Sequence, residues 1–115
     1  MDDIHYPVYE RLKRAARNEE LVFYGEIADI VGLNMNLDKD RGELGRILGA
    51  ISLWEHQQSR PMLSVVAVLK NENTPSQGFF DWARQLGKLE GNTDMEELMF
   101  FATELRAAYD YWKDH

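Results

Sequence analysis

The order of apolar patterns between Tyr24 and Phe80 most constrains how this chain can fold. A short apolar helix over residues 26–31 is predicted to end at Gly32, and the polar linker LNMNLDKD follows it. A longer helix is predicted over about residues 40–57, with Asp38 or Asp40 as its cap. The apolar run 62–69 then predicts a buried strand, and we expect a second strand within residues 76–80 that completes a small β-hairpin.

Two further helices are predicted to flank this segment. Apolar residues at helical spacing predict a helix over residues 3–18. Near the C-terminus, Thr93 and Glu96 form a capping-box pattern, and apolar residues then recur every three or four positions as far as Trp112. A chain of 115 residues fits a single domain, 1–115. The predicted class is therefore α+β and mostly helical, with the hairpin in the middle and a helix at each end.

The middle segment resembles a winged helix-turn-helix domain. In detail it resembles the DNA-binding domain of the O6-alkylguanine alkyltransferase and alkyltransferase-like families, through Tyr24-Gly25-Glu26-Ile27-Ala28, the helix from Arg41 to Gly49, and Pro61 ahead of the apolar run. The resemblance implies a winged-helix-like core that binds DNA. It does not imply alkyl transfer, because Pro61-Met62-Leu63-Ser64 replaces the family's Pro-Cys-His-Arg and the chain has no cysteine. The stretches GRILGAISLWE, RPMLSVVAV and GFF of the same segment also resemble small uncharacterised bacterial proteins of mobile elements or phages.

The charge of the chain is unevenly distributed. The net charge is −7, which repels phosphate backbones at long range. Residues 1–40 hold nine acids and five bases, residues 41–88 four acids and six bases, and residues 89–115 seven acids and two bases. The middle segment, residues 41–88, has a net charge of +2 and is thus the part of the chain that repels an anion least.

The basic residues of the middle segment are the candidates for contacts to nucleic acid. If the longer helix enters the major groove, its N-terminal part carries the contacts. The predicted interface consists of Lys39, Arg41 and Arg46 on this helix, with Arg60 and Lys70 on the wing. Alternatively these are solvated charges beside Asp38, Asp40 and Glu43, since a DNA reader normally carries a denser basic face.

Small and aromatic residues form two more candidate surfaces. Gly45 and Gly49 lie one turn apart on the longer helix, where they either let a ligand or backbone approach closely or pack against the first or last helix. The cluster Phe79, Phe80 and Trp82 either stacks on bases or a flat ligand or belongs to the core.

Patterns typical of enzymes are weak in this chain. The three histidines, His5, His56 and His115, share no metal-ligand spacing, and no phosphate-binding glycine loop or GxSxG motif occurs. We therefore predict no catalytic residue, metal or cofactor, and a small non-enzymatic module of nucleic-acid-binding or regulatory function. An alternative is a small-molecule binder or enzyme with a closed pocket near Tyr24 and His56.

The C-terminal helix carries more apolar residues than one stripe holds. A second subunit covers part of it, or all of it is core; the predicted homodimer interface comprises Met95, Leu98, Met99, Phe101, Leu105, Tyr109 and Trp112. A further alternative function is a protein–protein adaptor or acidic inhibitor that acts through this helix.

The location of the protein is inferred from missing signals. The N-terminus, MDDIHYP, has no apolar signal-like core, and the apolar run 62–69 is too short to span a bilayer. We expect a soluble cytoplasmic protein with no membrane partner.

Overall fold

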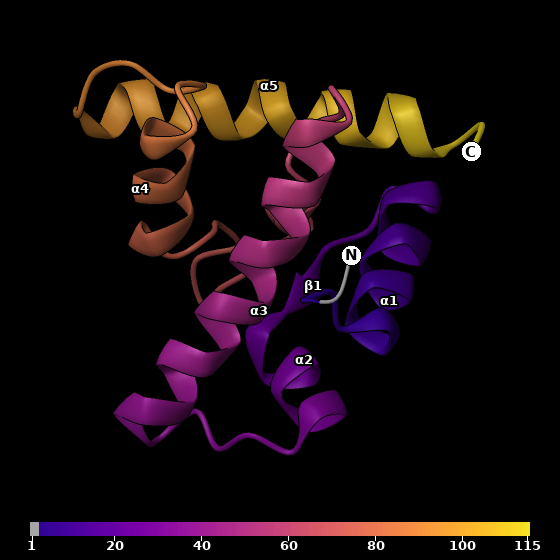
Figure 1. Cartoon of the computed structure of the whole chain (residues 1–115). Helices are drawn as coiled ribbons and strands as arrows, with labels where there is room; N and C mark the ends of the chain where they lie inside the picture. Colours follow the sequence, from indigo (N-terminus) through magenta and orange to yellow (C-terminus); the bar gives the residue numbers. More distant parts are fainter. Residues whose placement is uncertain (1–2) are drawn as a thin grey trace.

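Helices make up most of the structure, a computed structural model that describes residues 3–115. The elements follow in the order α1 (Tyr6–Arg17), β1 (Val22–Phe23), α2 (Tyr24–Val31), α3 (Asp38–Gln57), the 3₁₀ helix η1 (Leu63–Val66), β2 (Ala67–Val68), α4 (Gln77–Gln85) and α5 (Asp94–Trp112). Helix α5 extends across the top of Figure 1, above α4, α3 and α1, and α2 lies at the opposite end of the molecule. The predicted mostly helical α+β class is confirmed.

The two short strands do not form the predicted hairpin. β1 and β2 pair in parallel, with Val22 opposite Ala67 and Phe23 opposite Val68. Of the strand predicted over residues 62–69, only Ala67–Val68 form a strand, and Leu63–Val66 form the 3₁₀ helix η1. A short apolar run signals burial without specifying the backbone conformation. The second strand, expected within residues 76–80, is wrong, because α4 begins there. Parallel pairing needs a long crossover, which α2 and α3 provide.

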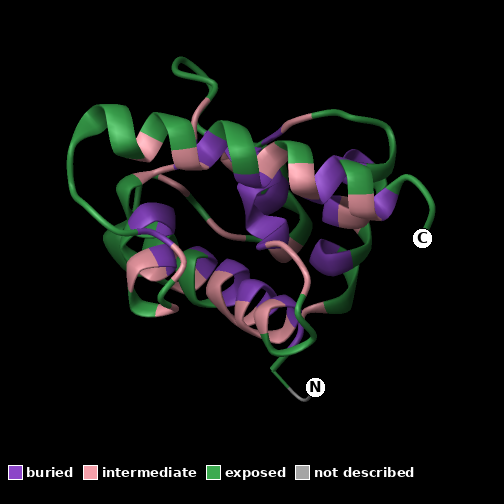
Figure 2. Ribbon diagram, turned by 90° about the horizontal axis from the view of Figure 1, so that it is seen from above, coloured by how far each residue is buried: buried purple, intermediate pink, exposed green. Residues whose placement is uncertain are grey.

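The segment from Met62 to Val68 forms the centre of the core. Met62, Leu63, Val65 and Val66 are fully buried, and η1 packs against α1, α3 and α5. Figure 2 shows that buried residues gather in the middle of the molecule and on the inner sides of the helices. Because these helices enclose the segment, a polar side chain there has to be hydrogen-bonded within the protein. Every side chain of the segment is apolar or hydrogen-bonded.

Two of the three predicted helix ends are confirmed, and His5 provides a cap that was not predicted. His5 precedes α1 and its Nδ1 accepts a hydrogen bond from the Val8 amide at 3.3 Å. Gly32 ends α2 in the left-handed conformation, and Thr93 and Glu96 form the predicted capping box of α5. The prediction of Asp38 or Asp40 as the cap of α3 was wrong, because Leu37 occupies the N-cap position. The Asp40 carboxylate instead accepts a hydrogen bond from the Asn34 amide.

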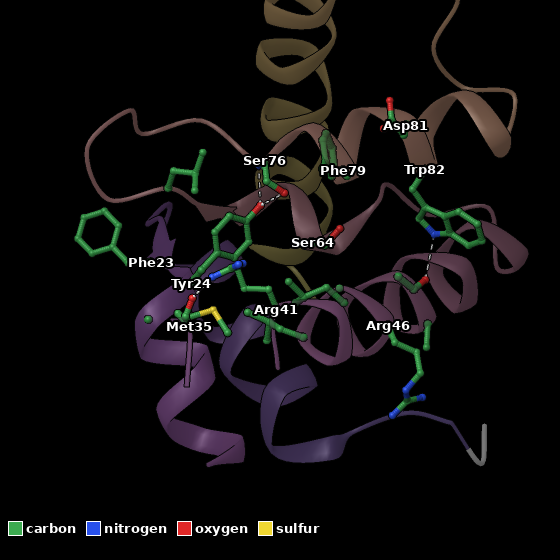
Figure 3. Close-up of a pocket in the computed structure, with 18 of the residues that line it drawn as sticks. Phe23, Tyr24, Met35, Arg41, Arg46, Ser64, Ser76, Phe79, Asp81 and Trp82 are labelled. Atoms are coloured by element: carbon green, nitrogen blue, oxygen red, sulfur yellow. Dashed lines mark hydrogen bonds between the residues drawn. The ribbon is translucent and has the colours of Figure 1, made fainter. Parts of the chain in front are cut away.

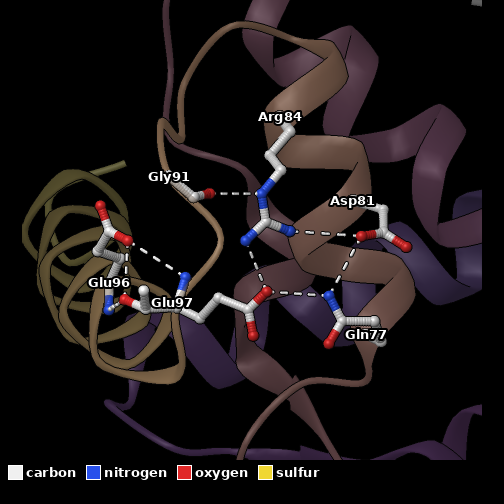
Figure 4. A network of polar contacts seen from close by, with 7 residues as sticks. Gln77, Asp81, Arg84, Gly91, Glu96 and Glu97 are labelled. Carbon is white, nitrogen blue, oxygen red and sulfur yellow. Dashed lines mark hydrogen bonds and ion pairs between the residues drawn. The ribbon is translucent and has the colours of Figure 1, made fainter.

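Charged side chains join the helices at several places, among them Glu55 with Arg60 and Arg84 with Glu97. Glu55 is fully buried, accepts a hydrogen bond from the Tyr9 hydroxyl at 2.7 Å, and pairs with Arg60. At the other end of the molecule, Arg84 of α4 donates to the Gly91 carbonyl at 2.7 Å and to the Glu97 carboxylate of α5 at 2.7 Å (Figure 4). Arg84 thus fixes the loop between α4 and α5 as well as both helices.

Helix α5 divides the residues predicted as a dimer interface into two groups. Phe101, Tyr109 and Trp112 are buried by the chain itself, and Leu105 is partly buried against the core. These four residues therefore pack within the chain, which corrects their assignment to an open interface. Met95, Leu98 and Met99 are 64%, 53% and 63% exposed.

Candidate functional site

An open cleft of about 1270 Å³ lies between α2, α3 and α4. Figure 3 shows side chains from all three helices, and from the loop after β2, pointing into it. Its aromatic and apolar lining includes Phe23, Tyr24, Met35, Leu44, Leu48, Leu69, Phe79 and Trp82. Apolar side chains dominate the walls of the cleft.

Glycines bring the helix backbone to the surface of this cleft. Gly25 of α2 and Gly45 and Gly49 of α3 all line it. A Cβ atom added at Gly25 or Gly45 would meet no other atom within 4 Å, and neither residue is among the glycines with positive φ. Internal packing and backbone conformation therefore do not require glycine at either position, although glycine inside a helix costs about 1 kcal/mol relative to alanine.

Gly49 differs from these two glycines because it packs against another helix. The indole Nε1 of Trp82 donates a hydrogen bond to the Gly49 carbonyl at 3.0 Å, and a Cβ at Gly49 would touch the same ring at 3.7 Å. Its packing partner is thus α4, whereas the sequence prediction named the first or last helix. Phe79 and Phe80 are buried as the core alternative predicted, and Phe79 and Trp82 also line the cleft.

One end of the cleft is fixed by a hydrogen bond between α2 and the start of α4. The Tyr24 hydroxyl accepts a hydrogen bond from the Ser76 amide at 2.8 Å and lies 3.4 Å from the Ser76 Oγ. Burial raises the pKa of Tyr24 above its ordinary value, even though the bonds to Ser76 act in the opposite direction. Tyr24 therefore stays neutral and holds the residue that precedes α4.

Three of the five predicted nucleic-acid contacts meet at the cleft. Arg41, Arg46 and Lys70 line it, whereas Lys39 is exposed on α3 outside the lining. Arg60 lies beyond the far end of α3, where its guanidinium pairs with buried Glu55. The structure thus brings together the cations of the N-terminal half of α3 and of the loop after β2.

Both arginines of the cleft are already engaged by acids of the same helix. Arg46 donates from Nε and Nη2 to the two carboxylate oxygens of Glu43, each at 2.8 Å. Arg41 pairs with Asp38 and also donates to the Met35 carbonyl at 2.6 Å. Four acids, Asp3, Glu26, Asp29 and Asp81, also line the cleft beside the three cations, so the formal charge of the lining is −1.

A buried hydroxyl pair lies at the base of the cleft. The Ser64 Oγ is 2.6 Å from the Ser52 Oγ, and the Ser64 amide donates to Ser52 at 3.1 Å. His56, expected in a closed pocket, is not among the lining residues, and the cleft that Tyr24 lines is open. Within residues 3–115, no group of three or more His, Cys, Asp or Glu side chains is placed to hold a metal ion.

Several lining residues were not predicted as nucleic-acid contacts. Tyr24 was predicted only for the pocket of the alternative function; it begins the Tyr-Gly-x-x-Ala motif, and Ser64 stands in the segment aligned with the family's Pro-Cys-His-Arg. Phe23 and Met35 carried none, since neither belongs to a motif. Only the fold places them beside α3.

Comparison of the chain with known protein families, curated proteins and solved structures found no match. Among residues 3–115, no helix combines the length and the apolar character needed to cross a membrane.

Proposed function

We propose that this protein is a small non-enzymatic module that binds nucleic acid at the cleft between α2, α3 and α4. One observation carries the proposal: two segments that resemble the alkyltransferase DNA-binding domain line this one cleft. They supply Tyr24 and Gly25 from α2, and Arg46 and Gly49 from α3.

The arrangement supports a winged-helix-like mode of binding. In this proposal α2 and α3 form the helix-turn-helix, the N-terminal half of α3 faces the nucleic acid, and the loop after β2 takes the place of a wing. Arg41 and Arg46 would contact phosphates or base edges from α3, and Lys70 would contact a phosphate from the loop. The aromatic rings of Tyr24 and Phe79 offer stacking surfaces for unpaired bases.

The charge of the protein sets the expected strength of this binding. Each phosphate neutralised contributes about −0.9 to the slope of log K against log salt, so three cations give a slope of about −3. The net charge of −7 acts against association at long range. We therefore expect weak binding of DNA that has no preferred structure. This binding should be measurable at low salt and lost at physiological salt.

Fluorescence anisotropy with labelled single-stranded and mixed-sequence duplex DNA at low salt tests the proposal. Arg46→Ala should weaken binding about fivefold or more, because it removes a cation at the cleft. Gly45→Leu should also weaken binding, because the new side chain occupies the cleft, which is open at this position.

The matched control for the filled cleft is Ala102→Leu, which adds a similar side chain on the exposed face of α5. It should bind as the wild type does. If wild-type protein binds neither form of DNA at low salt, nucleic acid is rejected as the ligand.

A polypeptide segment is the second candidate ligand. The cleft volume of about 1270 Å³ exceeds the range of about 300–1,000 Å³ common for small-molecule pockets, and the net charge of −7 favours a basic partner. Under this alternative, Gly45→Leu would abolish binding of a basic peptide while no DNA binds.

A further inference from the structure

The ion pair between Glu43 and Arg46 lies at the edge of the cleft. Arg46 lines the cleft, and Glu43 is three residues earlier on α3, so the two side chains lie on the same face of the helix. The pair is bidentate, with both distances 2.8 Å, and its side chains are 56% and 43% exposed. The guanidinium therefore offers Glu43 the geometry that it would offer to a phosphate.

We propose that Glu43 is a specificity-determining residue that competes with nucleic-acid phosphate for Arg46. The inference rests on the proposed function, because it concerns how the cleft selects among nucleic acids. A phosphate that binds the Nε and Nη2 edge of Arg46 must replace the Glu43 carboxylate, which remains nearby as a repelling charge. Ligands that contact only phosphates lose affinity, whereas a ligand that also fills the cleft gains contacts that offset this loss.

The surroundings of Arg41 support the same competition. Arg41 is held by Asp38 and by the Met35 carbonyl, so two of the three cleft cations already have acceptors in the free protein. Lys70, by contrast, makes no ion pair with any residue between 3 and 115. An exposed ion pair on one helix is weak, so Glu43 lowers the affinity for phosphate without preventing phosphate from binding.

The first test compares Glu43→Gln with Glu10→Gln in the DNA titration at low salt. Glu10 is 61% exposed and pairs with Lys13 on α1, outside the cleft, and its substitution changes the net charge equally. Glu43→Gln should tighten binding of mixed-sequence duplex DNA about two- to fivefold, the range that an exposed ion pair allows. Glu10→Gln should change it by much less, and equal effects of the two variants would overturn the inference.

The second test asks whether the effect of Glu43 depends on Arg46. In an Arg46→Ala background, Glu43→Gln should no longer tighten binding, because there is no guanidinium to release. Tightening that persists without Arg46 would show general charge repulsion and overturn the proposed competition.

A carboxyl-detected NMR titration adds a readout independent of affinity. In the free protein, the bond to Arg46 lowers the pKa of Glu43 below its ordinary value. Saturating DNA should raise that pKa, since Glu43 loses its partner and gains a phosphate neighbour.

The outcomes separate this inference from the proposed function. If the wild type binds, Arg46→Ala weakens binding and Glu43→Gln has no effect, only the competition is overturned. If neither the wild type nor Glu43→Gln binds DNA at low salt, the nucleic-acid function itself is rejected, and the competition with it.

Discussion

At the scale of single residues, Glu55 is the group on which the structure depends most visibly. Its carboxylate accepts hydrogen bonds from the Tyr9 hydroxyl of α1 and from Nε and Nη2 of Arg60, at 2.7, 3.1 and 2.8 Å. The Arg60 guanidinium also lies 5.8 Å from the Trp112 ring and 5.9 Å from that of Tyr111. Arg60 thus connects the end of α3 to α1 and α5, which explains why it does not join the cations of the cleft.

Removal of Arg60 should therefore be costly for stability. Arg60→Ala leaves the buried Glu55 carboxylate without its cation, and losses of about 3–5 kcal/mol are typical when one partner of a buried pair is removed. Urea denaturation at neutral pH measures the change in the free energy of unfolding. Arg106→Ala is the matched control, since it breaks only exposed pairs, with Glu19 and Asp110, and should cost far less than Arg60→Ala. Similar losses in the two variants would contradict this role of Arg60.

Tyr24 makes the stability of the fold depend on pH at the alkaline end. Burial raises its pKa in the folded protein, so its contribution is fully present below the unfolded value of about 10 and is lost as pH rises toward the folded value. Above pH 10 the free energy of unfolding of the wild type falls as the pH rises. Tyr24→Phe should make this slope shallower by up to about 1.4 kcal/mol per pH unit. The measurement is a series of urea denaturations from pH 7 to 11. An unchanged slope in the variant would show that the folded and unfolded pKa values of Tyr24 are alike.

At the scale of elements, the sequence predicted the helices well and the strands poorly. Periodic apolar residues and the Thr93–Glu96 capping box are local signals, and α3 and α5 begin and end within two residues of the predicted bounds. The segment 62–69 has no such signal, because its conformation is decided by contacts with α1, α3 and α5. The cleft was predictable in part: Arg41, Arg46 and Lys70 meet there, but the Tyr24–Ser76 bond joins residues 52 positions apart.

The start of α5 offers a test of a local element. Gly91 has a φ of +83°, and a Cβ at this position would lie against the carboxylate of Glu96, which belongs to the capping box. Gly91→Ala should destabilise the protein by about 1–3 kcal/mol, because it strains the backbone and displaces Glu96 from Thr93. Gly42→Ala, in the exposed part of α3 with no atom near the new Cβ, should instead stabilise it by up to about 1 kcal/mol. Thermal unfolding followed by circular dichroism compares both with the wild type, and a neutral Gly91→Ala would contradict the role of the capping box.

At the scale of the whole molecule, part of the acidic charge lines the cleft and part lies away from it. The cleft is made almost entirely by residues 23–85, and Asp3, Glu26, Asp29 and Asp81 line it beside its three cations. Helices α1 and α5 cover η1 and leave the cleft open, and α5 carries five acids against one base. These two helices therefore build the core without occupying the site, and the acids of α5 lower the general affinity for polyanions.

The parallel pairing of β1 with β2 also has a consequence for synthesis of the chain. Val22 pairs with Ala67, so the first third of the protein has no strand partner and no η1 to pack on until residues 62–68 have left the ribosome. Closing a loop of this length precedes the contacts that stabilise it, which slows folding relative to a bundle of neighbouring helices. Helices α1 to α3 thus emerge with an exposed apolar face, and the nascent chain acquires its tertiary structure only after more than half of it has been translated.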